Sequence, residues 1–502
     1  MDVSRDHIVH SRAGKLGAQG VSTEADVKRI LKQASDATPR AGLIIHFHGG
    51  LVSEKSARVI AQTLAPRYDG ADAYPLFFVW ESGLIETLSN NLGDIKDDKV
   101  FREFVTKVAQ WVIKKLPGAV TTKGAGGATV DKRKLRKGFD DWFEGRATEP
   151  PVPLGTPDAG PALKGTAEPD VDDLAENINA EIDTDESFQE VMAGLYVASK
   201  RGSDAKTKGG QPAAADVEAL VDQRALEEMF PSRTRDKTKG VLSWIKVARF
   251  VAKIVVAVIK RRLRDRDHGT YTTIVEEVLR AAYIDKVGTV VWNSMKKDTA
   301  DAFASDSASV GTAVVAGLKS LADEGKGFKR IVLVGHSTGA IYINHLIEYA
   351  ATALPGMKFD VVLLAPASRF EDFSKVLKKH PDSISNLRMF AMTDALESDD
   401  KLVPIIYPRS LLYFVSGLLE GDIDTPILGM QRFINLERVF DEANFPPVDH
   451  VRKWLAMTQS RSIWSEDTRV NGLGSKSHKH GDFDNDQLTV DSVCWILKHG
   501  YA

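Results

Sequence analysis

Residues 331–340 read Ile-Val-Leu-Val-Gly-His-Ser-Thr-Gly-Ala, an apolar run that leads directly into a Gly-x-Ser-x-Gly turn. The run is rich in β-branched residues and predicts a buried strand, and residues 340–347 predict a helix packed on a sheet. A turn this sharp strains the backbone of Ser337, and Gly335 and Gly339 leave space where a Cβ would clash. The sequence therefore predicts a serine hydroxyl that is lifted clear of a sheet, within reach of a base.

Strand and helix signals alternate on both sides of this turn. Short apolar runs are separated by segments of helical periodicity, which is typical of βαβ units and a parallel sheet. We therefore expect the α/β class, with a mostly parallel sheet flanked by helices. The expected strands are residues 43–51, 74–80, 331–334, 359–366 and 387–392, and the expected helices lie near 53–64, 290–303, 310–321, 369–379 and 487–498.

The strand signals stop between residues 82 and 284, and this interruption divides the chain into three parts. Residues 1–81 and 285–502 are expected to form the two halves of one α/β core, and residues 82–284 a mainly helical insertion that serves as a cap or lid. Polar tracts rich in Gly, Ala, Pro and Lys predict loops or linkers inside the insertion, where proteases are expected to cut first. These tracts are residues 121–137, 146–169 and 200–214.

Residues 241–264 form the most unusual segment of the insertion, because nearly all of its uncharged residues are apolar. Five of its basic residues recur at helical spacing along one face. They are Lys246, Arg249, Lys253, Lys260 and Arg264. One interpretation is a mostly buried helix with a narrow solvated stripe. The other is a basic amphipathic helix that contacts a membrane or lipid surface peripherally.

The composition is that of a folded protein without a global charge signature. Of the 502 residues 43% are hydrophobic and the formal net charge is −3, so no nucleic-acid partner is expected. Cys494 is the one cysteine and cannot form an internal disulfide, which fits a reducing compartment. The first residues contain no apolar signal segment, and no uncharged run is long enough to span a bilayer. The expected location is the cytoplasm.

A serine nucleophile needs a base, and the base needs an orienting acid, since the free alkoxide does not exist at pH 7. In the chain order Ser, Asp, His, both partners follow strands after the serine. The acid candidates are Asp400, in the sequence Asp-Lys-Leu-Val-Pro, and Asp394, which is nearer the end of the preceding strand. The base candidate is His480, with His478 as a rival two residues away and His450 as a more distant one.

Together these motifs resemble the α/β-hydrolases of the serine esterase and lipase type. Residues 335–339 match the nucleophile elbow of that family, and the His-Gly-Gly at 48–50 matches its loop after the third strand. Residues 400–404 resemble the turn that often carries the acid, and His480 precedes the last helix, where such folds place the base. The resemblance implies the α/β-hydrolase fold.

The resemblance covers residues 38–81 and 285–502, and two features depart from the family pattern. The insertion lies early, directly after the strand at 74–80, whereas caps more often come later. The segment before residue 43 is short and poor in strand signal. It predicts a sheet trimmed of the usual first two strands.

The resemblance also implies a serine hydrolase that cleaves carboxylic esters through an acyl-enzyme. Ser337 would attack the carbonyl, His480 would take up and return the proton, and Asp400 would orient the imidazole. The oxyanion hole would comprise the backbone N–H groups of Gly50, Leu51 and Thr338. Small-molecule or lipid esters are the expected substrates. The alternatives are thioester or amide hydrolysis on the same residues, or an interaction or membrane-associated role for a hydrolase scaffold.

No cofactor and no metal is expected. The His46/His48 and His478/His480 pairs have the spacing of metal ligands, but the first pair lacks a following Asp or His. Residues 482–487 begin like a calcium loop with three alternating aspartates. The sixth position is glutamine rather than glycine, and the twelfth is valine rather than glutamate, so the loop lacks what calcium binding requires.

Overall fold

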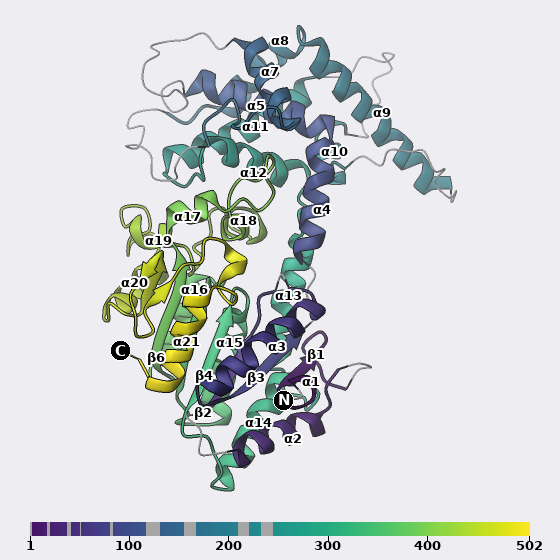
Figure 1. Cartoon of the computed structure of the whole chain (residues 1–502). Coiled ribbons are helices and arrows are strands. Elements are labelled where there is room, and N and C mark those ends of the chain that lie inside the picture. Colours follow the sequence, from purple (N-terminus) through teal and green to yellow (C-terminus); the bar gives the residue numbers. More distant parts are fainter. Residues whose placement is uncertain are drawn as a thin grey trace.

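A computed structural model gives the fold of the chain (Figure 1). It describes residues 3–17, 21–37, 42–50, 52–80, 84–116, 131–154, 167–208, 220–231 and 244–501. The polar tracts expected at 121–137, 146–169 and 200–214 lie partly outside these residues, and so does part of the region where proteolysis is expected.

Seven strands form one parallel sheet, which confirms the α/β class. The strand order is β1-β3-β2-β4-β5-β6-β7, and every neighbouring pair runs parallel. The inner strands are almost entirely buried, because helices cover both faces of the sheet. The strands are β1 (Ile8–Ser11), β2 (Gly42–Phe47), β3 (Ala73–Trp80), β4 (Ile331–His336), β5 (Phe359–Leu364), β6 (Ile384–Met392) and β7 (Ser462–Ser465).

The strand order changes direction at β2. The chain passes from β2 outward to β3 on one side and returns to β4 on the other, so that Phe47 pairs with Phe78 and with Gly335. In open parallel sheets, ligands bind in the crevice beyond the carboxyl ends of the strands at such a switch point. The His-Gly-Gly loop follows β2 and the serine turn follows β4. The topology therefore brings the two motifs to the same place.

Helices cover both faces of the sheet in a three-layer arrangement. Strand residues that point to one face, such as Ile44 and Val334, join a core with two helices, and those that point to the other, such as Ile45 and Leu333, join a second core. The first pair of helices is α3 (Glu54–Gly70) and α21 (Gln487–His499). The second group includes α2 (Glu24–Asp36), α14 (Val310–Asp323), α15 (Gly339–Ala353), α16 (Phe370–Lys379) and α20 (Pro446–Ala456).

A separate group of helices lies beyond the carboxyl end of the sheet, at the top of Figure 1, and is here named the helical region. It spans residues 84–282. Helix α4 leads out to it from the end of β3, and α13 (Thr289–Asp301) leads back to the sheet. Asn91 of α4 donates a hydrogen bond at 2.7 Å to the carbonyl of Lys286, just before α13, and so joins the two connections. Its helices are α4 (Leu84–Asp97), α5 (Lys99–Lys115), α7 (Lys132–Phe143), α8 (Val171–Ile182), α9 (Glu186–Lys208), α10 (Gln223–Met229), α11 (Trp244–Leu263) and α12 (Thr270–Ala282).

Helix α11 contains the apolar segment with the basic stripe, and it packs inside the helical region against α5, α8 and α12. Most of its apolar residues are buried, whereas Ile245 near its start is exposed. Several basic side chains of the stripe pair with acidic residues of the same region: Arg249 with Asp172 at 3.0 Å, and Lys260 with Glu168 at 3.2 Å. This packing favours the interpretation as a buried helix with a solvated stripe, since its apolar face is already covered.

The helical region rests on the segment that follows β6. The Tyr271 hydroxyl and the Trp142 indole N–H both donate to the Ile405 carbonyl, at 2.7 and 3.0 Å. Arg409 donates to the Leu154 carbonyl at 2.9 Å. Buried side chains thus bridge two parts of the chain that are far apart in sequence. The segment itself contains α17 (Asp394–Asp399), α18 (Leu411–Phe414), the π-helical turn Val415–Leu419 and α19 (Gln431–Asn435).

Three sequence-based expectations are wrong in part. The sheet is not trimmed of both early strands, because β1 pairs with β3 as an edge strand. The polar tract at 121–137 ends inside α7, whose Leu135 and Phe139 are buried, and the tract at 200–214 begins inside α9. Lys- and Ala-rich composition favours helix as readily as loop once one face finds a partner.

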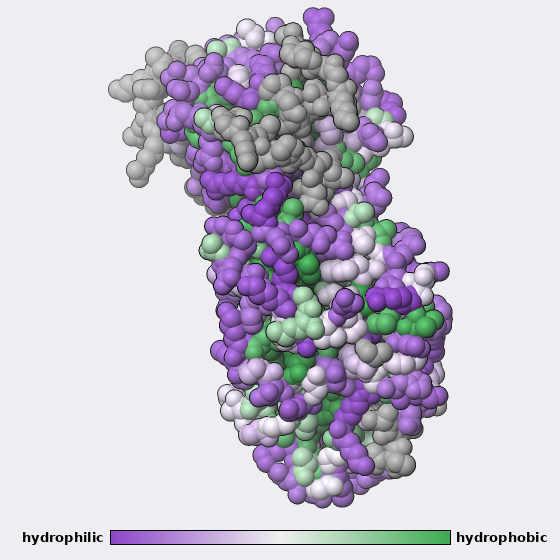
Figure 2. Space-filling model, turned by 90° about the vertical axis from the view of Figure 1, so that its left-hand side faces the viewer, coloured by the Kyte–Doolittle hydropathy of each residue, from purple (hydrophilic) through white to green (hydrophobic). Residues whose placement is uncertain are grey.

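No helix among the described residues has the length and apolar character needed to cross a bilayer. The face of the molecule in Figure 2 is mostly hydrophilic, with hydrophobic residues in small separate patches.

Candidate active site

Ser337 lies in the turn between β4 and α15 and has a positive φ of 54°. A non-glycine residue in this region of φ/ψ space is strained and is held there by its surroundings. Here the main chain fixes it: the Ser337 N–H donates to the Leu364 carbonyl at 2.8 Å, and its own carbonyl accepts from Ala367 at 3.0 Å. The strain predicted from the Gly-x-Ser-x-Gly turn is therefore present at the serine.

The two glycines of the turn lie where the backbone segments approach most closely. A Cβ on Gly335 would lie 2.7 Å from the Gly339 carbonyl carbon, and a Cβ on Gly339 would lie 2.4 Å from the Phe47 carbonyl oxygen. Both neighbours are backbone atoms that cannot move aside. Any larger residue would push α15 away from β2 and β4.

His480 reaches Ser337 from a short helical turn near the end of the chain, just before α21. Its Nε2 lies 2.9 Å from Ser337 Oγ, although the two residues are far apart in sequence. Its main chain is held from both sides: the backbone N–H donates to Asp400 Oδ2 at 2.9 Å, and the carbonyl accepts from His336 Nε2, also at 2.9 Å. The imidazole is thus positioned through its backbone.

The two acid candidates lie in different surroundings. Asp400 is adjacent to His480, but it contacts the backbone N–H and not the ring, and burial raises the pKa of its carboxyl group. His480 Nδ1 has no hydrogen-bond partner among the described residues. Asp394 starts α17 and accepts a hydrogen bond from the Tyr413 hydroxyl at 2.6 Å. Of the two, only Asp400 is next to His480.

His336 and Asp484 form a charged pair next to Ser337 and His480 that the sequence did not suggest. His336 Nδ1 lies 3.2 Å from Asp484 Oδ2, and its Nε2 faces the His480 carbonyl. Because both ring nitrogens face acceptors, the imidazole carries two protons. Burial alone would lower its pKa, but the Asp484 carboxylate raises the pKa of His336 above its usual value.

His480 is neutral in this arrangement. Burial lowers its pKa to about 3, and the nearby His336 adds to the effect. A neutral imidazole with Nε2 facing a serine hydroxyl can accept the serine proton. The arrangement has the geometry of a serine activated by a general base.

The His-Gly-Gly loop lies beside Ser337, as the topology requires. A Cβ on Gly49 would be 3.4 Å from the Ser337 Cβ. His48 fixes this loop through both ring nitrogens. Its Nε2 accepts a hydrogen bond from the backbone N–H of Trp80 at 3.2 Å, so Nδ1 carries the proton and donates to the Gly49 carbonyl at 2.7 Å. Because a trans peptide points its C=O and N–H in opposite directions, the Gly50 N–H faces away from His48.

Gly50 and Thr338 form adjoining walls of the site. A Cβ on Gly50 would be 2.5 Å from Thr338 Oγ1, and this buried hydroxyl has no hydrogen-bond partner within the described parts of the chain. Thr338 occupies the N-cap position of α15, where backbone N–H groups are free of helical partners. Both of these expected oxyanion donors therefore lie close to the serine. The third, Leu51, falls outside the described residues.

The site is closed in this structure. Ser337 is 2% exposed and His480 is 5% exposed. Met295 of α13 covers one side, because its Sδ occupies the space where a Gly50 side chain would lie. Helix α13 is tied down by Trp292 and Lys296, which both donate to Glu420 at 2.9 Å. Access to Ser337 requires movement of this cover or of another wall.

The remaining candidate residues lie away from the serine. His478 is exposed and pairs with Glu466, and His450 faces the Ser374 hydroxyl at 2.9 Å. Cys494 is partly buried in α21 and faces the Arg67 carbonyl. The described residues contain no cluster of three or more His, Cys, Asp or Glu side chains that could hold a metal ion.

Comparisons of the chain with protein-family models, with curated proteins and with solved structures find no match.

Proposed function

We propose that this protein is a serine hydrolase that cleaves carboxylic esters and has the α/β-hydrolase fold, with the helical region as its cap. The observation that carries the proposal is the contact between Ser337 Oγ and His480 Nε2 at 2.9 Å, made by a serine with positive φ at the end of a central parallel strand. A strained serine facing a buried neutral imidazole is the arrangement that nucleophilic catalysis needs.

In the proposed reaction, Ser337 Oγ attacks the ester carbonyl while His480 Nε2 takes the serine proton. The oxyanion receives hydrogen bonds from the Thr338 and Gly50 N–H groups, each worth about 3–4 kcal/mol in such sites. The C–O bond to the alcohol then breaks, and the alcohol leaves with the proton from His480. Water, deprotonated by His480, attacks the acyl-enzyme and releases the carboxylic acid.

Asp400 has a positioning role in this scheme. Its carboxylate holds the backbone N–H of His480, while His336 holds the carbonyl of the same residue. These two bonds fix the distance from imidazole to serine before substrate binds. Small-molecule and lipid esters are the proposed substrate class.

Labelling with a fluorophosphonate tests the proposal, because such probes react with an activated serine whatever its natural substrate. We expect the wild-type protein to be labelled and the Ser337→Ala and His480→Ala variants to remain unlabelled. His478→Ala is the matched control: it removes a neighbouring histidine that is exposed and paired with Glu466, and labelling should be unchanged.

The closed site calls for one further variant in this experiment. Met295→Ala removes the side chain that lies against Gly50 without touching Ser337 or His480. If neither the wild type nor this variant reacts while both are folded, the serine is not activated. The chain would then be a binding protein on a hydrolase-like scaffold.

A further inference from the structure

A cavity of about 620 Å³ lies where the helical region meets the α/β layers, and it contains neither Ser337 nor His480. Three arginines line it: Arg280 from α12, Arg266 from the connection between α11 and α12, and Arg369 from the start of α16. Its apolar walls include Phe370, Ile423, Pro426, Phe445 and Pro447. This volume is in the usual range for sites that bind small molecules.

Arg280 is the unusual member of the lining. It is partly buried, and its guanidinium donates to the Gly417 carbonyl. Its Nε is buried without a hydrogen-bond partner among the described residues. The carboxylates whose charges act on it are Glu277 and Glu276 of the same helix. Burial lowers the pKa of Arg280, which reflects a charge held away from water. A cation in this position is unfavourable unless an anion accompanies it.

The other two arginines already have partners. Arg369 forms a bidentate pair with Asp372 at 2.8 and 3.0 Å. Arg266 contacts Asp424 Oδ2 at 3.4 Å and lies over the ring of Phe445. The acidic residues of the lining, Glu371 and Asp422, are exposed to solvent. Of the three arginines, Arg280 is therefore the one whose hydrogen bond goes to a backbone carbonyl and not to a carboxylate, as far as the chain is described.

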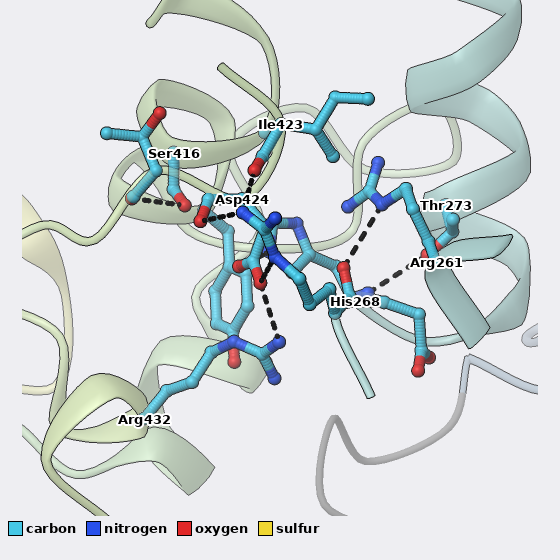
Figure 3. Close-up of polar contacts among 12 residues, drawn as sticks. Arg261, His268, Thr273, Ser416, Ile423, Asp424 and Arg432 are labelled. Carbon is cyan, nitrogen blue, oxygen red and sulfur yellow. Dashed lines mark hydrogen bonds and ion pairs between the residues drawn. The ribbon is translucent and has the colours of Figure 1, made fainter. Parts of the chain in front are cut away.

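The buried carboxylates Glu276, Glu277 and Asp424 belong to a separate network, part of which is shown in Figure 3. His268 lies between two of them, with Nδ1 at 2.8 Å from Glu276 and Nε2 at 2.9 Å from Asp424. Arg261 pairs with Glu276 at 2.6 Å and with Glu277 at 2.9 Å. Burial alone would raise the pKa of Glu276, but His268 and Arg261 lower it to about 2.

Asp424 is occupied in the same way, because Arg432 contacts its Oδ2 at 3.3 Å in addition to His268. Both Asp424 and Arg432 have no exposed side-chain surface. The carboxylates of the network are thus bonded to His268, Arg261 and Arg432, and Glu276 and Glu277 act on Arg280 through their charge, without a hydrogen bond to it.

We infer that this cavity is a binding site for an amphiphilic anion, a ligand with a carboxylate or phosphate head on a hydrocarbon body. The head contacts the Arg280 guanidinium, whose planar N–H groups suit both anions. The hydrocarbon body lies along Phe370, Ile423, Pro426 and Phe445. The site is separate from Ser337, and its occupancy does not depend on ester hydrolysis.

Isothermal titration calorimetry of the full chain tests the inference with four probes: octanoate, octyl phosphate, octanol and inorganic phosphate. We expect saturable binding of octanoate, octyl phosphate or both, and much weaker binding of octanol and inorganic phosphate. The comparison of octanoate with octyl phosphate shows which head group the site prefers. Arg280→Gln is expected to weaken binding of the preferred probe by about tenfold or more, because a hydrogen bond to a charged group is lost.

Arg461→Gln is the matched control. Arg461 also donates to a backbone carbonyl, that of Trp454, and burial also lowers its pKa, but it does not line the cavity. Its substitution should leave binding within about twofold of wild type. If Arg280→Gln does not fold, Arg280→Lys, which keeps the charge, should retain more binding than Arg280→Met.

Four results would overturn the inference. They are absence of binding of both amphiphilic anions to the wild type, octanol binding as tightly as octanoate, inorganic phosphate binding as tightly as octyl phosphate, and unchanged binding in a folded Arg280→Gln. The first three need no variant, so they remain decisive if Arg280 is needed for folding.

Discussion

The two ring nitrogens of His480 have different surroundings. Nε2 faces the Ser337 hydroxyl, whereas Nδ1 has no hydrogen-bond partner among the described residues. The residue is held by its backbone, through Asp400 on the N–H and His336 on the carbonyl. In this arrangement the carboxylate of Asp400 acts as a hydrogen-bond acceptor, and its charge is not applied directly to the imidazole.

Substitutions of Asp400 separate these two effects. Asparagine keeps an oxygen that can accept the backbone N–H of His480, whereas alanine removes it. We expect Asp400→Asn to keep most of the fluorophosphonate labelling rate and Asp400→Ala to lose about tenfold or more, as a buried donor left without a partner costs about 1–3 kcal/mol. An Asp400→Asn variant as inactive as Asp400→Ala would mean that the negative charge acts on the ring.

The low pKa of His480 makes a second prediction at this scale. At any pH well above the His480 pKa of about 3, the imidazole is neutral and can accept the serine proton. We expect the labelling rate of the wild type to stay constant from pH 8 down to about pH 5. A rate that falls by half near pH 6.5 would instead indicate an ordinary solvent-exposed histidine.

At the scale of elements, the inner strands could be predicted from the sequence and the edge strands could not. Strands β2, β4 and β5 are buried on both faces, so they appear as continuous apolar runs. The edge strands β1 and β7 are short and contain polar residues, such as the two serines that bound β7. Their pairing with β3 and β6 is decided by tertiary contacts, which local patterns do not record.

The same distinction applies to the candidate site. The serine turn and the His-Gly-Gly loop are local motifs, and chain order placed His480 among the candidates. The pairing of His336 with Asp484, and the cover formed by Met295, join segments that are distant in sequence. Asp484 lies four residues after His480, and this closeness is the local signal of its role. Because Asp484 alternates with Asp482 and Asp486, the sequence resembles the start of a calcium loop instead.

Helix α13 carries the prediction that belongs to this scale. Its Met295 side chain lies against Gly50 and closes one side of the site. We expect Met295→Ala to raise the rate of fluorophosphonate labelling several-fold, because the probe then reaches Ser337 without displacing a buried side chain. Val291→Ala, on an exposed position of the same helix, is the control and should not change the rate. Equal rates in wild type and Met295→Ala would place the path to the serine elsewhere.

For the whole molecule, the buried histidines predict sensitivity to acid. Burial lowers the pKa of His46 to about 3, of His48 to about 4 and of His480 to about 3. As the pH falls below 6.5, the unfolded chain binds protons at these positions and the folded chain does not. Each histidine should therefore lower the free energy of unfolding by about 1.4 kcal/mol per pH unit between about pH 6 and 4.

Urea unfolding at pH 7, 6 and 5 measures this dependence. His46→Gln removes one of the three groups. The slope of the unfolding free energy against pH should therefore be smaller than in the wild type by about 1.4 kcal/mol per pH unit, which corresponds to one proton. The slope, not the absolute stability, is the quantity to compare, since the substitution also removes the contact of His46 with the Tyr68 hydroxyl. An unchanged slope would show that His46 is protonated in the folded protein.

The position of β2 between β3 and β4 has a consequence for synthesis of the protein on the ribosome. Strand β2 can pair with β3 as soon as both have emerged, but its other edge waits for β4, which follows residues 81–330. At about 5–20 residues per second, this wait is on the order of tens of seconds. During that time an apolar strand edge is unpaired, as in an incomplete sheet prone to aggregation. The nascent chain therefore exposes this edge for longer than a sheet built from strands consecutive in sequence would.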